Sequence, residues 1–329
     1  MSAIIVRAQE QAPRIGYIEF FGTSGIELQK VKDSLAAYEG QELSFAKLPH
    51  LRAEVSRLVQ TPFGKEPTDV APVCCDNQGR WILFVGLQGK NYRTFSYNPA
   101  PRGTATLPTH IVDVYRQAMD LIFESIRKGA IEDRSKGYAL STYPPLRAKQ
   151  LAMREYAVSH AGLIRRVLLE AADAEQRTVA AALLGYANQN NQQITSLIRA
   201  SRDPNDGVRN NAVRALVVLA EASRITASKI PAAPFVSMLN SGIWTDRNKT
   251  SYLLSYLTNR RDEKLFRLIQ EQAIESLIEM ARWQNPGHAD TSRRILGHLA
   301  GIPEDQLQKL IAEQKVEEIV AALMKKRTD

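Results

Sequence analysis

Basic side chains, together with one asparagine, recur in three consecutive stretches that have helical periodicity. The stretches are 204–222, 245–258 and 288–300. If these helices stack side by side, their cations form a stripe that suits an acidic peptide or a phosphate backbone. The candidate binding residues are Asn210, Arg214, Lys249, Arg293 and Arg294.

Four aromatic residues lie in or beside the same stretches and leave two interpretations open. In a nucleic-acid-binding protein they stack on bases beside the basic stripe. In the alternative they are core residues, and the cations belong to a solvated face. The net charge of +8 does not decide between them, because the excess is spread thinly and is not gathered in a basic arm. The aromatic residues are Trp244, Tyr252, Tyr256 and Trp283.

The remaining reactive residue types form no recognisable catalytic or metal-binding pattern. The five histidines are scattered, and no two lie at metal-ligand spacing on one helix face. His-Glu-x-x-His, Gly-x-Ser-x-Gly and phosphate-loop patterns are missing. We therefore expect a protein that is not an enzyme, with no metal and no cofactor, although catalytic groups can converge from distant positions. The histidines are His50, His110, His160, His288 and His298.

The two cysteines, Cys74 and Cys75, are adjacent and cannot staple a long loop. One interpretation is a vicinal disulfide with a redox role. The other is two strand residues that face opposite sides of a sheet.

The stretch from Asp203 to Ala220 shows how the basic residues are positioned. Asp203 can cap a helix, and Pro204 suits the first helical position, where its missing N–H is not needed. The apolar residues then follow the spacing of one helix face, while Asn210 and Arg214 fall on the other face. The apolar face comprises Val208, Ala212, Ala215, Leu216 and Leu219.

The same pattern occurs 32 residues earlier, in 173–184. Here the residues Arg177, Ala180 and Leu184 correspond to Arg209, Ala212 and Leu216. A fixed period of this length made of helix pairs indicates a helical solenoid. The chain here resembles the HEAT-repeat family, in which each repeat is a helical hairpin. The resemblance implies that Arg177 and Arg209 tie adjacent repeats to nearby Asp side chains or helix-end carbonyls.

The solenoid is predicted to be right-handed and to extend over 107–329, with helices of irregular spacing after residue 222. A helical pattern that includes Leu151 and Val158 is expected to form one or two helices from 144 onward, and residues 130–143 are expected to form a surface loop. Three helical hairpins and a last helix that begins at Pro303 should follow. The predicted hairpins pair 194–200 with 204–222, 235–239 with 245–258, and 265–281 with 288–300.

Residues 14–98 are predicted to form a separate, small α+β domain. A strand over 14–22 is followed by two amphipathic helices and by a hairpin of 70–75 with 81–87, whose turn contains Gly79. This β-α-α-β-β order and the opening strand resemble a POTRA domain, a family of envelope modules that bind polypeptides by strand addition. The alternative is an unrelated α+β cap on the solenoid. Pro72 favours an edge strand.

These patterns favour a non-enzymatic adaptor for an unidentified protein or peptide; the alternative is a HEAT-like nucleic-acid-binding protein of the DNA-repair type. No apolar run is long enough to span a membrane. The run at 3–6 is too short for a secretory signal, but it could end a longer one that begins upstream. That case would indicate the cell envelope or periplasm, and otherwise the cytoplasm.

Overall fold

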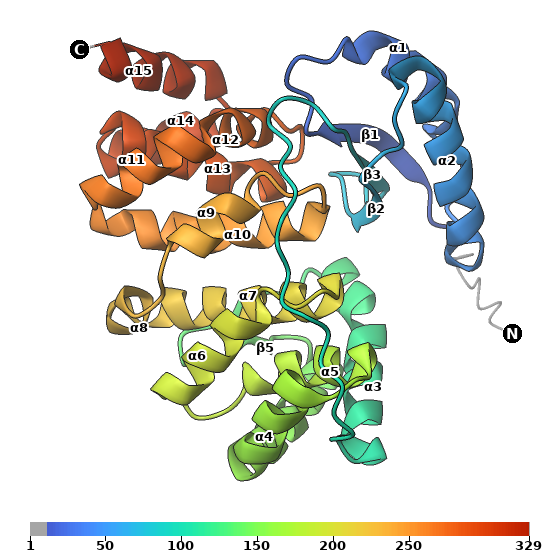
Figure 1. Ribbon diagram of the computed structural model, residues 1–329, viewed down its shortest axis with the longest axis vertical. Coiled ribbons are helices and arrows are strands. Elements are labelled where there is room, and N and C mark those ends of the chain that lie inside the picture. The colour runs from blue at the N-terminus through green and yellow to red at the C-terminus, as the bar shows by residue number, and fades with distance from the viewer. Residues whose placement is uncertain (1–11, 329) are drawn as a thin grey trace, which may run out of the picture. The chain divides into compact units, whose positions relative to one another are not determined.

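The computed structural model describes residues 12–328, so the apolar run at 3–6 lies outside the described residues. The chain divides into two compact units between Tyr92 and Arg93 (Figure 1). Residues 93–98, which the sequence pattern places in the first domain, therefore belong to the second unit. None of the helices within 12–328 is long and apolar enough to cross a membrane.

The first unit contains a three-stranded mixed sheet with the order β1-β3-β2. β3 pairs in parallel with β1 and antiparallel with β2, and the predicted β-α-α-β-β order is confirmed. Pro72 lies on β2, which is an edge strand, as predicted from its missing N–H. The strands are β1 (Ile15–Phe21), β2 (Asp69–Cys74) and β3 (Trp81–Gly86).

The helices of the first unit pack against each other and close a core on the sheet. That core is made of residues such as Ile18, Val31, Val55 and Leu83. The bond between the sulfurs of Cys74 and Cys75 is a vicinal disulfide, and Cys75 lies beyond the end of β2. The helices are α1 (Leu28–Leu35) and α2 (Leu48–Phe63), with 3-10 turns η1 (Ala36–Tyr38) and η2 (Phe45–Lys47).

The second unit is an α-solenoid. Its helices α5, α7, α10, α13 and α15 contact one another in succession and form one row, and a shorter helix precedes most of them. The predicted hairpins correspond to α6 with α7, α9 with α10, and α12 with α13. The helices are α3 (Thr109–Arg127), α4 (Pro144–Glu170), α5 (Ala174–Leu184), α6 (Asn191–Ala200), α7 (Asp206–Ala222), α8 (Arg224–Ser228), α9 (Ala233–Met238), α10 (Trp244–Leu257), η3 (Thr258–Arg260), α11 (Glu263–Gln272), α12 (Ile274–Ala281), α13 (Pro286–Ala300), α14 (Glu304–Ala312) and α15 (Val316–Thr328).

Two predicted helices are each divided in two. The stretch 265–281 breaks at Ala273 into α11 and α12. The last helix breaks between α14 and α15, where Gln314 has a φ of 54°. Periodicity alone does not reveal these breaks, because the apolar spacing continues across them.

The contact between α5 and α7 confirms the inward face predicted from the repeat. The side chains of Ala180, Leu184, Ala212 and Leu216 are fully buried. The apolar residues of α4 are not all buried, since Leu151 and Val158 are 46% and 41% exposed.

Buried arginines join consecutive repeats, as the HEAT resemblance implies. The Arg177 guanidinium donates to both carboxylate oxygens of Asp203, at 2.8 and 3.0 Å. Arg209 does the same to Asp246 at the same two distances. Asp203 therefore joins two repeats and is not the N-cap of α7, contrary to the prediction. The N-cap is Asn205, whose side chain accepts a hydrogen bond from the Val208 amide.

Each of these arginines also binds the carbonyl groups of the loop that precedes its helix. Arg177 donates to the carbonyls of Ala171 and Ala172, both at 2.9 Å. In α13, Arg293 occupies a similar place, because its Nε donates to the Ala281 carbonyl at 2.9 Å. Such bonds satisfy carbonyls at helix ends that otherwise lack partners.

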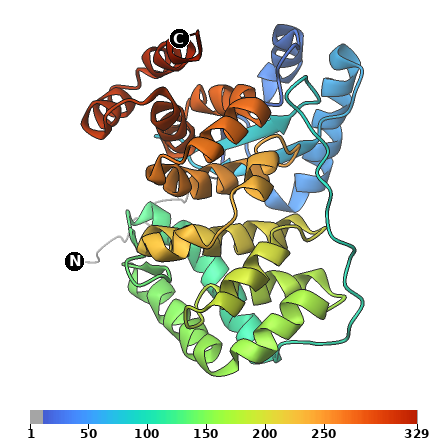
Figure 2. The same ribbon diagram turned by 60° about the vertical axis from the view of Figure 1, so that its left-hand side comes forward.

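An extended segment, 93–107, runs along the loops of three repeats (Figure 2). It contains no strand, so it does not extend the hairpin of β2 and β3, although Phe95 and Tyr97 alternate in the sequence. The Tyr97 ring lies 4.2 Å from the Arg209 guanidinium, which adds a cation–π contact to the repeat junction. Backbone hydrogen bonds join Arg93 to Asn240, Asn98 to Arg202, and Gly103 to Glu170 and Ala172.

Candidate functional site

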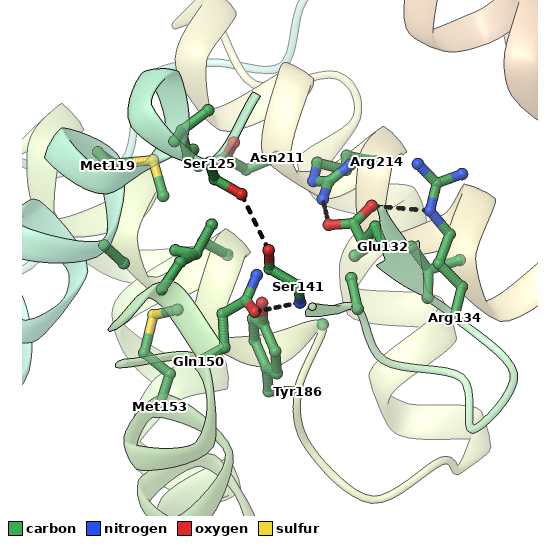
Figure 3. Close-up of a pocket in the computed structure, with 18 of the residues that line it drawn as sticks. Met119, Ser125, Glu132, Arg134, Ser141, Gln150, Met153, Tyr186, Asn211 and Arg214 are labelled. Atoms are coloured by element: carbon green, nitrogen blue, oxygen red, sulfur yellow. Dashed lines mark hydrogen bonds and ion pairs between the residues drawn. The ribbon is translucent and has the colours of Figure 1, made fainter. Parts of the chain in front are cut away.

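A pocket of about 520 Å³ lies in the second unit where α3 and the hairpin of β4 (Glu132–Asp133) and β5 (Leu140–Ser141) face the helix row. Residues of α4, α5, α7 and α10 complete its wall (Figure 3). Ligand pockets usually have volumes of about 300–1,000 Å³. This pocket is therefore large enough for a ligand, and its wall brings together distant parts of the sequence.

The floor of the pocket is apolar and uncharged. Ala118, Leu146 and Met153 are at most 5% exposed, and they line the pocket. The buried hydroxyl groups of Ser125 and Ser141 are 2.9 Å apart and bond to each other. The floor thus contains polar atoms that are already paired, and it offers a ligand mainly apolar contact.

The other end of the pocket holds a charged cluster built on Glu132. Its carboxylate bonds to Arg134 Nε at 2.8 Å and also to the Arg214 guanidinium (Figure 3). Arg134 also donates to Glu221 at 3.2 Å. Burial opposes ionisation of Glu132, but the charges of Arg214 and Arg134 outweigh it and hold the pKa of this carboxyl below its ordinary value.

Lys249 is a further cation at this end of the pocket. Its Nζ lies 3.4 Å from Asn248 Oδ1, and within 12–328 no carboxylate lies at ion-pair distance from it. Burial, followed by the charges of Arg214 and Arg134, lowers the pKa of Lys249 to about 8. The lining thus contains three cations, Arg134, Arg214 and Lys249, against the single carboxylate of Glu132.

We expect Lys249→Met to stabilise the protein by about 1 kcal/mol at pH 7. The folded-state pKa lies below the unfolded value, so folding penalises the charged lysine below pH 8. The penalty is relieved as the pH rises from about 8 towards 10.5. Urea unfolding at pH 7 and pH 10 should show a clearly larger gain at pH 7 than at pH 10. The control is Lys309→Met, at an exposed position. An equal gain in the free energy of unfolding there would show that the destabilisation is not specific to the buried charge of Lys249.

Three of the five candidate residues line this pocket, namely Asn210, Arg214 and Lys249. Arg293 does not, because it is 3% exposed and is bound to backbone carbonyls and to Asp290. Arg294 pairs with Glu304 at 2.8 Å and lies outside the pocket lining. The predicted stripe of basic residues therefore does not extend onto α13.

Of the four aromatic residues, the two tryptophans belong to the core and the two tyrosines are partly buried. Trp244 and Trp283 are only 6% and 2% exposed. The Tyr252 hydroxyl donates to the Gly287 carbonyl at 2.6 Å. Burial, and then the nearby Glu221, raises the pKa of Tyr256 to about 12. The two tryptophans therefore correspond to the core interpretation, not to a base-stacking surface.

Sequence reasoning missed the residues of the β4–β5 hairpin, because 130–143 was expected to be a surface loop. Glu132 meets Arg214 across 82 positions of sequence, and no local period predicts such a contact. No metal site is indicated either, because the His, Cys, Asp and Glu residues of the described part of the chain form no group of three or more possible ligands.

No protein-family model and no curated protein matches the chain. Solved structures with similar helix stacks include a designed armadillo repeat protein at 16% identity, which covers 54% of this chain and 85% of its own, with a TM-score of 0.38. Another is a designed armadillo repeat protein in complex with the peptide (KR)4, at 13% identity, 56% and 93% coverage and a TM-score of 0.37. A third, described as computationally designed for modular peptide recognition, has 13% identity, 65% and 98% coverage and a TM-score of 0.39. Likeness at this level supports no inference about a ligand.

Proposed function

We propose that this protein is a non-enzymatic adaptor that binds a polypeptide at the pocket beside α5, α7 and α10. The observation that carries the proposal is the combination of a buried apolar floor with an excess of cations at one end of a single pocket. A polypeptide with acidic and apolar residues complements both parts.

Nucleic-acid binding is less well supported by the same residues. Affinity for a phosphate backbone depends on several accessible cations in a row. Here Arg293 is buried, Arg294 is paired with Glu304, and Glu132 partly neutralises Arg214. Two tryptophans that would stack on bases are buried.

We propose further that the first unit is POTRA-like and supplies a second polypeptide-binding surface. Its strand order and the place of β2 at an edge of the sheet support this view. An edge strand can accept an added strand through its free backbone groups.

Site-specific photo-crosslinking in the native host tests the adaptor function. A photoreactive amino acid is placed at Asn210, which lines the pocket, or at the 74% exposed Ile225, and lysates are treated with nuclease. We expect a discrete polypeptide adduct from position 210 that is missing from position 225. Identical patterns from both positions, or an adduct that nuclease removes, would contradict the proposal.

A further inference from the structure

We infer that the pocket binds a polypeptide segment in which a large apolar side chain is flanked by acidic residues, and that a ligand carboxylate competes with Glu132 for Arg214. This inference rests on the proposed adaptor function and names the partner's chemistry. It follows from the depth at which each kind of side chain lies.

The floor of the pocket is apolar and deep, whereas both apolar and charged side chains lie nearer the solvent. The floor residues Ala118 and Met153 are 0% and 2% exposed, whereas the Arg214 side chain is 39% exposed. Two further residues of the lining, Ile126 and Ile131, are 50% and 73% exposed and form an apolar rim. A ligand that inserts an apolar group into the floor can therefore place a carboxylate beside Arg214.

The floor is built to accept an apolar group of variable shape. Met119 and Met153 both line it, and their flexible, polarisable thioether side chains adapt to different partners (Figure 3). A volume of about 520 Å³ leaves room for an aromatic or leucine side chain together with its flanking backbone.

The charged end can accept a carboxylate from outside. Lys249 lies there without a carboxylate partner in the described part of the chain, and Arg134 and Arg214 share the Glu132 carboxylate. Glu132 thus occupies the position that a ligand carboxylate would take. Its displacement breaks the contacts of its carboxylate with Arg134 and Arg214, and a ligand carboxylate can make the same contacts.

Fluorescence anisotropy with short labelled peptides on the full-length protein tests the ligand class. The probe is an acetylated and amidated peptide with one phenylalanine between two pairs of glutamates. We expect replacement of the phenylalanine by alanine, or of the glutamates by glutamines, to weaken binding by about tenfold or more in each case. Equal affinity of the glutamate and glutamine peptides would overturn the inference.

Protein variants test the competition by Glu132. Arg214→Gln should weaken binding of the probe by about tenfold, whereas Glu132→Gln should strengthen it by roughly fivefold because it removes the internal competitor. The control is Arg294→Gln, a basic residue outside the pocket, which should leave the affinity unchanged. Unchanged or weaker binding by Glu132→Gln would overturn the competition, and thermal unfolding checks that each variant is folded.

Binding of dodecanoate, a fatty acid, tests whether the ligand of the pocket is a free amphiphile or a polypeptide. If dodecanoate binds and the phenylalanine peptide does not, the ligand is a lipid-like acid and the inference is wrong. If photo-crosslinking from position 210 yields a polypeptide while the peptide probe fails to bind, the adaptor function stands and only the inferred ligand class falls.

Discussion

Substituting Arg209 by alanine should lower the free energy of unfolding of the second unit by about 3–5 kcal/mol. The side chains of Arg209 and Asp246 are 2% and 0% exposed, and they form two hydrogen bonds. Removing the guanidinium leaves the Asp246 carboxylate buried without its cation. It also leaves the Asp203 and Pro204 carbonyls without the donor that caps them.

A matched control has the same geometry on the surface. Arg282 donates through Nε and one terminal nitrogen to both oxygens of Glu317, at 2.8 and 2.9 Å, but the two side chains are 51% and 65% exposed. Arg282→Ala should therefore cost at most about 1 kcal/mol. Urea unfolding followed by far-UV circular dichroism measures both variants. Equal losses would show that the buried arginine does not hold the repeats together.

Leu216→Ala should be the second strongly destabilising change, at about 2–5 kcal/mol. Leu216 is fully buried in the contact of α7 with its neighbours, so the substitution removes apolar burial and leaves a cavity. The same substitution at Leu151, which is 46% exposed, should cost less than about 0.5 kcal/mol. A similar cost at the two positions would contradict the assigned packing of the helix row.

Leu216 and Leu151 also show how far the fold could be predicted from sequence. The inward face of α7 was predictable because the same spacing recurs 32 residues earlier and both copies bury the same positions. In α4 the helical pattern has no second copy, so it does not show which of its leucines are buried, and Leu151 is 46% exposed. The repeated pattern thus predicts which faces of α5 and α7 turn inward, whereas a helix without a second copy offers no such evidence.

The candidate site was predictable only in part, for a different reason. Asn210, Arg214 and Lys249 lie on helices that the repeat pattern places side by side, and the structure brings them to one pocket. Glu132 and Arg134 come from a short hairpin whose strands have two residues each, too few for a detectable period. The partner of Arg214 therefore depends on tertiary contacts that sequence spacing does not encode.

Methyl NMR spectroscopy of methionine-labelled protein tests the pocket as the polypeptide-binding site most directly. Met119 and Met153 line the pocket, whereas Met238 and Met280 are fully buried elsewhere in the second unit. Adding the phenylalanine and glutamate peptide should shift the methyl signals of Met119 and Met153 and leave those of Met238 and Met280 in place. Saturating peptide that shifts Met238 or Met280 but neither pocket methionine would contradict the account.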